Sequence, residues 1–127
     1  MSVATLTRPT VQPVKAPLQA AIPDGRMYAI AFDMDTDTLQ RAYPGPSWNN
    51  AYADIQRVLT RHGFNRQPGS VYFGNPQVNP VTCVLAAMDL ARSLPWFSIS
   101  VRDIRMLRIE EQNDLLPAVL QAAPITE

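Results

Sequence analysis

Cysteine and histidine are almost absent from this chain of 127 residues, which contains one of each, Cys83 and His62. A single cysteine excludes an intrachain disulfide and any metal site built from several cysteines. We interpret Cys83 as a small apolar core residue on a helix. His62 falls in the last turn of a predicted helix, where a cation complements the helix dipole, and this capping role is favoured over catalysis.

Long apolar runs are also missing from the chain. No segment is long enough to span a bilayer, and no basic stretch leads into an unbroken apolar run as it does in a secretory signal. We therefore expect a cytoplasmic protein that makes no contact with membranes.

Residues 1–26 contain few aromatic and aliphatic side chains, and four prolines alternate there with Thr, Val, Gln and Ala. Such a segment buries too little surface to fold, and we interpret it as a disordered Pro-rich tail. Residues 27–120 then form one domain, since the chain is 46% hydrophobic and has no internal repeat. Residues 121–127, which include Pro124, are expected to be a frayed C-terminus.

The charge balance limits the ways in which the chain can bind nucleic acid. Basic and acidic residues number 11 each, but without the Pro-rich tail 8 basic residues face 10 acidic ones, a net charge of about −2. This balance argues against a DNA-binding regulator and against a bulk electrostatic attraction of nucleic acid. Any contact with nucleic acid must come from a local cluster of arginines.

The segment 27–37 is the most informative stretch of the chain. Six largely apolar residues are followed by Asp33, Asp35 and Asp37, as in a strand that carries carboxylates at its end. Because strand side chains alternate, one face holds Tyr28, Ile30 and Phe32 and the other holds Met27, Ala29, Ala31 and Asp33. A carboxylate among alanines lies near water at a sheet edge or is neutralised in an interface. The local pattern by itself favours a solvated turn for all three acids.

The rest of the chain divides into clearly bounded elements. Apolar residues at spacings of three and four predict a helix over 50–62, with Asn49 or Asn50 as its N-cap and Gly63 as its stop. Residues 64–74 predict a short hairpin. A second, well-buried helix begins at Asn79-Pro80 and ends before Pro95. Two adjoining stripes of apolar residues, one of which includes Val81, Val84, Leu85 and Met88, are expected to be buried. Only a narrow strip is then left exposed: Thr82, Ala86, Asp89 and Ser93.

The C-terminal part predicts one more strand and a short helix. Residues 96–104 favour a strand through their β-branched and aromatic content, with Phe97, Ile99 and Val101 on one face. The strand continues to Ile109, and a slip in alternation between Met106 and Leu107 indicates a bulge or a break. Residues 110–120 are compatible with a short helix.

Strand, helix, strand, strand, helix and strand follow one another in this order. The order predicts an α+β, ferredoxin-like split βαβ fold (βαββαβ), an antiparallel sheet with two helices on one face, plus a short C-terminal strand or helix. The other face of the sheet, with Met27, Ala29 and Ala31, is too apolar to be left in water. We therefore expect a homodimer that pairs through this face or through a sheet edge.

Three groups of residues, in this order, resemble the virulence-associated protein D (VapD) family. They are the first strand 27–33, the hairpin residues 69–72, and the segments 100–105 and 108–110 near the end. The resemblance covers about residues 27–116, includes the helix start at 49–52 and leaves out the Pro-rich tail. Members of this family look like small ferredoxin-fold homodimers similar to CRISPR-associated endoribonucleases, and some are described as toxins paired with an antitoxin protein.

The resemblance implies roles for particular residues. Asp33 matches the acid expected to be catalytic, and Ser70, Tyr72, Arg102 and Arg105 match motif positions that are candidates for binding the RNA substrate. An unperturbed Asp, with a pKa of about 3.9, is a weak base. It therefore needs a raised pKa, which a second Asp33 across a twofold axis would provide, or a Mg²⁺ ion that Asp33 helps to bind.

Each of these roles has an alternative in ordinary protein structure. Asp103 and Glu110 can pair with the arginines at the surface. Arg102 and Arg105 fall on opposite faces of a strand unless a bulge intervenes, and Tyr72 can be packed in the hairpin instead of stacking on a base.

The leading hypothesis is therefore a dimeric endoribonuclease. The rival is a non-catalytic dimeric scaffold or protein-interaction module, which the near-neutral charge and the lack of a recognisable histidine–carboxylate pair favour.

Overall fold

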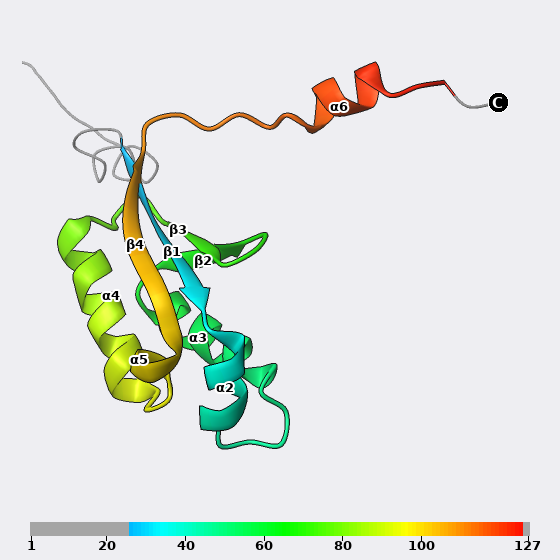
Figure 1. The fold of residues 1–127 in the computed structure, drawn as a ribbon. Coiled ribbons are helices and arrows are strands. Elements are labelled where there is room, and N and C mark those ends of the chain that lie inside the picture. The colour runs from blue at the N-terminus through cyan, green and yellow to red at the C-terminus, as the bar shows by residue number, and fades with distance from the viewer. Residues whose placement is uncertain (1–25, 126–127) are drawn as a thin grey trace, which may run out of the picture.

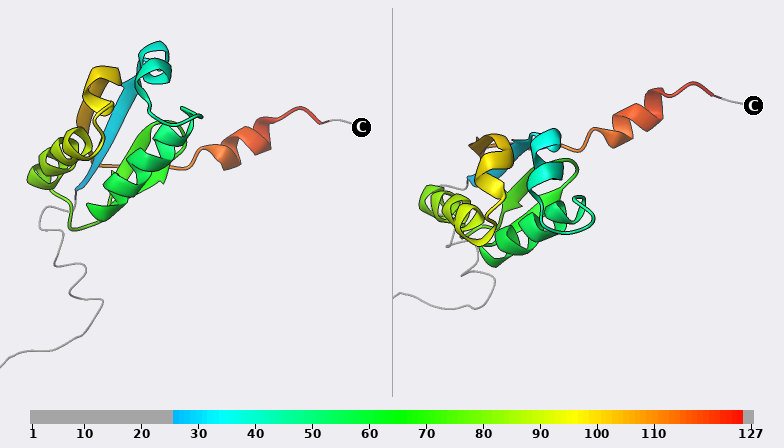
Figure 2. Two further views of the ribbon diagram at one scale, coloured as in Figure 1. Left: turned by 90° about the horizontal axis from the view of Figure 1, so that it is seen from below. Right: turned by 60° about the horizontal axis from the view of Figure 1, so that its bottom comes forward.

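The computed structural model describes residues 26–125, and these residues form a four-stranded antiparallel sheet covered on one side by helices (Figures 1 and 2). The strand order is β2-β3-β1-β4. The strands are β1 (Met27–Met34), β2 (Phe64–Gln67), β3 (Val71–Gly74) and β4 (Val101–Ile109), and the two long helices are α3 (Asn50–Arg61) and α4 (Pro80–Ser93). This arrangement confirms the predicted α+β, ferredoxin-like fold.

Side-chain alternation along β1 is as predicted. Tyr28, Ile30 and Phe32 belong to the buried core cluster, whereas Asp33 is exposed. The ring of Phe32 stacks on Tyr72 of β3 with centroids 6.1 Å apart, and Phe97 approaches Phe32 edge-on at 6.4 Å. The central strand is therefore held by aromatic packing on its helix-facing side, and its opposite face is left for other contacts.

The predicted ends of the two long helices are confirmed. Gly63 follows α3 with φ +91°, a left-handed conformation that glycine adopts without strain. Asn49 is the N-cap of α3, although its side chain makes no capping bond. Before α4, Asn79 and Thr82 form a reciprocal capping box and Pro80 occupies the first turn.

The hairpin of β2 and β3 is also confirmed, with Gly69 in its turn at φ +78°. Within residues 26–125 no helix has the length and apolar character that crossing a bilayer requires. The predicted disordered tail lies outside the described residues apart from Arg26.

The acids after β1 do not form a simple solvated turn. Residues 36–42 form a helix that sequence reasoning missed, α2 (Thr36–Ala42), and the side chain of Asp35 is its N-cap. Asp37 lies in the first turn of α2, where an acid favourably faces the helix dipole. The missed signal is the pattern of an acid followed by Thr-Asp-Thr-Leu, which is a capping sequence before an apolar residue, Leu39, that is fully buried.

The predicted strand 96–104 is wrong in its first half. Phe97–Ser100 form a short helix, α5, and β4 begins only at Val101. Consecutive strand residues point to opposite faces, but Trp96 and Phe97 are both buried, and a helical turn lets both rings reach the same core. Ile99 is consequently exposed and does not share a face with Phe97.

The second long helix is oriented differently from the prediction. Ala86, expected to be exposed, is buried together with Cys83 and Leu90, and this placement of Cys83 agrees with its interpretation as a core residue. The bulky stripe faces solvent instead, and its side chains are between 41% and 65% exposed: Val81, Val84, Leu85 and Met88. The smaller residues let α4 pack closely on the rest of the domain, so the wide apolar stripe remains uncovered in the single chain.

The last strand and the residues after it hold two further differences. β4 is continuous through Met106 and Leu107, so the bulge predicted there is wrong. The register shift lies at the other end of the strand, between Asp33 and Met34 of β1. After β4 the chain leaves the domain, and α6 (Leu116–Ala122) lies away from it with no buried residue (Figure 1). The predicted short helix therefore exists, but it covers 116–122 instead of 110–120, so 110–115 are not helical and 121–122, which were expected to fray, belong to the helix.

Candidate functional site

A β-bulge at the end of the first strand brings an arginine to two carboxylates. Asp33 pairs with Asp103 and Met34 pairs with Val101, so Arg102 is an extra residue in β4 without a partner in β1. A bulge turns side chains away from the regular alternation of a strand. The Arg102 guanidinium lies 3.7 Å from Asp33 Oδ2 through Nη1 and 3.9 Å from Asp35 Oδ2 through Nη2. The structure thus joins two predicted site residues, Asp33 and Arg102, with Asp35, which the sequence had left in a solvated turn.

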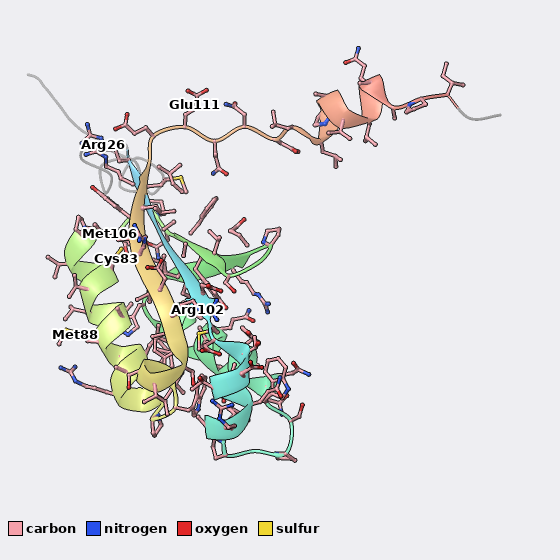
Figure 3. The ribbon with its side chains drawn as sticks, in the orientation of Figure 1. Arg26, Cys83, Met88, Arg102, Met106 and Glu111 are labelled. Atoms are coloured by element: carbon pink, nitrogen blue, oxygen red, sulfur yellow. The ribbon has the colours of Figure 1, made fainter. Side chains whose placement is uncertain are left out.

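The three side chains are accessible to a ligand. The side chains of Asp33 and Arg102 are 63% and 62% exposed, and that of Asp35 is 41% exposed. Asp33 lies on the same face of the sheet as Ala29 and Ala31, as predicted, and this face carries no helix. Figure 3 shows Arg102 close to the end of β1. Exposed charge pairs of this kind contribute little to the free energy of folding, so these side chains can change partners and contact a substrate at little cost to stability.

Asp35 has a structural role that Asp33 lacks. Its Oδ1 accepts a hydrogen bond of 3.2 Å from the backbone N–H of Thr38, and this bond is the main reason why the pKa of the Asp35 carboxyl is below its usual value. Its own N–H donates to the carbonyl of Ser100 at 2.7 Å. Asp35 therefore begins α2 and ties it to the turn before β4, while Asp33 has no such structural bond among the described residues.

The two remaining arginines of β4 form ion pairs with acids two residues away in the sequence. Arg105 Nε donates to Asp103 Oδ2 at 2.9 Å, and this bond raises the pKa of Arg105. Arg108 lies 3.1 Å from Glu110. The surface pairing that the sequence left open is therefore present for Arg105 and Arg108. Arg105 nevertheless lies opposite Ala31, on the open face that carries Asp33, so its charge is close to the candidate site.

The two hairpin candidates, Ser70 and Tyr72, are placed differently. Ser70 lies directly beside β1, because its carbonyl accepts a 3.1 Å hydrogen bond from the N–H of Phe32, the residue before Asp33. Tyr72 is only 2% exposed, and burial raises the pKa of its hydroxyl. Tyr72 thus has the packed position that was the alternative to base stacking, and its ring is not at the surface of this chain.

A metal site would have few ligands in one chain. Among residues 26–125 no group of three or more His, Cys, Asp or Glu side chains is placed to hold an ion. Asp33 and Asp35 are two carboxylates near one guanidinium, and Mg²⁺ is commonly bound by one or two carboxylates together with substrate phosphates. These two acids therefore fit a Mg²⁺ ion that arrives with a phosphate better than a permanent metal centre.

One polar cluster was missed by sequence reasoning altogether. His62 Nε2 lies 2.7 Å from Asp89 Oδ2, and Asp89 also accepts hydrogen bonds from Ser93 Oγ at 2.6 Å and from Arg61 at 3.2 Å. These bonds, first that of Ser93 and then that of His62, hold the pKa of Asp89 far below its usual value. The histidine–carboxylate pair that the sequence did not reveal thus exists, but it links α3 to α4. Its partners are 27 residues apart, so no local pattern could show it.

Fold and site together define a small α+β protein with a ferredoxin-like sheet and an acid–arginine cluster at the end of its first strand. No family model matches the chain. Several curated proteins are similar to it over nearly their whole lengths. Endoribonuclease VapD 2 of Riemerella anatipestifer is 48% identical over 93 residues, which are 73% of this chain and 99% of that protein.

Two more of these relatives come from Helicobacter pylori (strain ATCC 700392 / 26695). An endoribonuclease VapD homolog is 46% identical over 73% of this chain and 96% of its own length, and an endoribonuclease VapD is 37% identical over 73% and 98%. Identities at this level over nearly complete relatives show the family. The chain belongs to the VapD family of endoribonucleases, as the resemblance in its motifs indicated.

Proposed function

We propose that this chain is an endoribonuclease that cleaves RNA at the acid–arginine cluster, with Asp33 as the general base and Arg102 as the group that binds the phosphate. The observation that carries the proposal is the bulge at Arg102, which brings one guanidinium to within 3.7 Å of Asp33 and 3.9 Å of Asp35. The endoribonuclease names of the VapD relatives support the reaction class.

The reaction requires no nucleophile from the protein. The Asp33 carboxylate takes the proton of a ribose 2′-hydroxyl, the 2′-oxygen attacks the adjacent phosphorus, and the bond to the 5′-oxygen breaks. The products are a 2′,3′-cyclic phosphate and a 5′-hydroxyl end, whose oxygen takes its proton from water at the exposed site. The planar fork of Arg102 binds two phosphate oxygens and stabilises the charge that grows on them in the transition state.

Asp33 needs help to act as a base near neutral pH, and a homodimer would supply it. On the open sheet face Leu107 is 44% exposed and Ala31 and Phe73 are half-buried, whereas Ala29, in register with Phe73 and Leu107, is already buried in the single chain. If two copies pair through this face, their Asp33 carboxylates approach each other, and like charges raise the pKa of one of them. The uncovered apolar face supports this dimer.

A Mg²⁺ ion that enters with the phosphate would be held by Asp33 and Asp35, and it would supply acidified water and positive charge. We further propose that the enzyme acts in the cytoplasm as the toxin of a toxin–antitoxin pair. The resemblance to VapD proteins supports this pairing.

The test compares isosteric variants of two acids in the same segment of the chain. Asp33→Asn is expected to reduce RNA cleavage by about 10²- to 10⁴-fold, the usual contribution of a general base. Asp37→Asn is the matched control, because Asp37 is exposed in α2 and makes no ion pair with Arg102 among the described residues. Cleavage is measured on labelled single-stranded and structured RNA, with and without EDTA, and the ends of the products are analysed.

Thermal unfolding of both variants shows whether a loss of cleavage is caused by misfolding. The Asp33–Arg102 pair is exposed, so its removal should change stability by less than about 1 kcal/mol. Full cleavage by Asp33→Asn, or an equal loss in Asp37→Asn, would refute Asp33 as the base. A folded wild-type protein that cleaves no RNA with any common divalent metal, but retains a protein partner, would instead support the scaffold.

A further inference from the structure

A polar cavity lies where α3 ends and α4 begins, and we refer to it as the α3–α4 cavity. Its volume of about 330 Å³ is in the range of small-molecule sites. Its lining includes five polar or charged side chains: Arg61, His62, Asn75, Gln77 and Thr82. These residues come from the end of α3, the turn after β3 and the first turn of α4.

The α3–α4 cavity is separate from the acid–arginine cluster. Asn75 directly follows β3, and Phe73 of β3 pairs with Ala29 near the start of β1. Asp33 lies four residues further along β1, a distance of about 13 Å. In Figure 1 the start of α4 and the helix α2, which follows β1, lie at opposite ends of the domain. The cavity is therefore a second site and not an extension of the first.

The charges around the α3–α4 cavity favour an anion. Among the described residues that line it there is no acid, and Arg61, whose side chain is 56% exposed, adds a positive charge. Asn75 Oδ1 accepts the N–H of Gln77 at 2.8 Å, which leaves Asn75 Nδ2 as a donor. Within residues 26–125 neither this NH₂ group nor that of the Gln77 side chain has a hydrogen-bond acceptor. The cavity thus offers donors that the described residues leave unused.

His62 can add a second positive charge. Its Nε2 lies 2.7 Å from Asp89 Oδ2, and the hydrogen bonds of Ser93 and His62 keep Asp89 ionised by holding the pKa of its carboxyl far below the usual value. A carboxylate only accepts hydrogen bonds, so Nε2 carries the proton and Nδ1 holds the lone pair of the neutral ring. Nδ1 has no partner among the described residues. A second proton on Nδ1 turns it into a donor, while Asp89 neutralises the ring from the other side.

We propose that the α3–α4 cavity binds a phosphate monoester and that His62 is protonated on both ring nitrogens in the complex. A monoester carries about two negative charges near neutral pH, and two cations, Arg61 and the charged His62, match them. A phosphodiester within an RNA strand carries about one and is a poorer fit.

The neighbours of these two cations support the same ligand. Arg61 contacts Asp89 at 3.2 Å on the protein surface, which is a weak contact, and phosphate offers its guanidinium a two-oxygen partner. Thr82 lies in the first turn of the 14-residue helix α4, so the positive end of the α4 dipole adds to the attraction.

The phosphate monoester comes from a free nucleotide or from the phosphorylated end of an RNA, because both present the group that the cavity recognises. The inference uses none of Asp33, Asp35 and Arg102. It therefore goes beyond the proposed cleavage reaction and is independent of it.

The single histidine of the chain makes the proton a direct readout. His62 gives the only imidazole signals in nitrogen–proton correlation spectra of the labelled, untagged protein. Inorganic phosphate is expected to extend the doubly protonated form of His62 to higher pH than chloride of equal ionic strength does, because only that form donates from Nδ1. Identical His62 spectra in the two salts throughout the pH series would overturn the proposal.

Two arginine variants form a matched pair for calorimetric titration with adenosine 5′-monophosphate (AMP). Arg61 and Arg57 are exposed in α3, four residues apart, and each is paired with an acid, but only Arg61 lines the cavity. Arg61→Gln is expected to weaken AMP binding by about tenfold or more, and Arg57→Gln should leave it unchanged. Unaltered binding in a folded Arg61→Gln chain, or equal losses in the two variants, would contradict the site.

Further ligands identify the source of the phosphate. Adenosine that binds as tightly as AMP would refute the phosphate as the recognised group. Two short 2′-O-methyl RNAs, with and without a 5′-phosphate, are compared with AMP: tighter binding of the phosphorylated RNA assigns the cavity to RNA ends, and tighter binding of AMP assigns it to free nucleotides. AMP binding is expected unaltered in an Asp33→Asn chain, so failure of this site and failure of the nuclease assignment are distinguished.

Discussion

Replacement of the buried Ser100 by alanine is predicted to stabilise the protein, whereas most core substitutions destabilise it. Its side chain is 0% exposed, and among the described residues its Oγ has no hydrogen-bond partner. A buried hydroxyl without a partner costs about 1–3 kcal/mol of desolvation. Ser100→Ala removes this cost and loses the packing of a single oxygen atom. We therefore expect the variant to be more stable by about 1 kcal/mol, which raises the Tm by about 4–8 °C in a domain of this size.

The substitution leaves the backbone contact of the candidate site in place. The Ser100 carbonyl accepts the N–H of Asp35 at 2.7 Å, and alanine retains that carbonyl. RNA cleavage should therefore be unchanged. Ser98→Ala is the matched control, because Ser98 lies exposed in the same helix α5 and its substitution should alter stability by less than about 0.5 kcal/mol.

Differential scanning calorimetry of the two variants and the wild type measures the effect. A lower Tm for Ser100→Ala would refute the reasoning, because it would mean that the hydroxyl has a partner in the folded protein. An equal rise in Ser98→Ala would assign the gain to helix propensity and not to the buried hydroxyl. Loss of cleavage together with higher stability would place the hydroxyl among the groups that serve the reaction.

Two further predictions concern packing and pH. Gly74→Ala would place a Cβ 2.7 Å from the Val78 side chain and 3.0 Å from the Tyr28 carbonyl, so the free energy of unfolding in urea should fall by about 1–3 kcal/mol. Val78→Ala should recover part of this loss in the double variant, and strictly additive losses would contradict the contact. Asp89→Asn removes a carboxylate whose pKa is lowered in the folded state, and the stabilisation is present above the unfolded pKa of 3.8 and lost as pH falls through the folded value. The Tm difference from wild type should therefore persist down to about pH 4 and shrink as the pH falls further, and a difference that does not shrink below about pH 4 would argue against a carboxylate that is stabilised in the folded protein.

The core of the fold could be predicted from periodicity because the relevant residues are neighbours in sequence. Alternation over residues 27–33 placed Phe32 in the core and Asp33 on the open face, and both placements are confirmed. Gly63 and the Asn79-Pro80 pair mark helix ends through local backbone requirements, so these boundaries also followed from the sequence.

The orientation of α4 and the start of β4 could not be predicted in this way. The stripe of Val84 and Met88 is as apolar as the buried stripe, and the choice between them depends on how closely α4 packs against the domain. The choice between strand and helix at 97–100 depends on a core that needs both Trp96 and Phe97, which is a tertiary requirement that β propensity does not contain.

In the candidate site, too, some features could be predicted from the sequence and others depend on tertiary structure. Asp33 could be selected from strand alternation and the family motifs. Its association with Arg102 could not, because it depends on a single extra residue in β4 about 70 positions later, and alternation had suggested the bulge near Met106 instead. The capping role of Asp35 is local and was recognisable from the Asp-Thr-Asp-Thr sequence, but it was obscured by treating the three acids as one turn.

The position of Arg102 between two acids has a consequence for how RNA would enter the proposed site. In the free protein the guanidinium neutralises the carboxylates, through contacts that are long, exposed and easily screened by salt. An incoming phosphate offers the same guanidinium a planar, two-oxygen partner, which it binds more strongly. The substrate would then take the counter-ion away from Asp33 as it binds. The protein would thus hold its base in a masked state, and the RNA itself would unmask it.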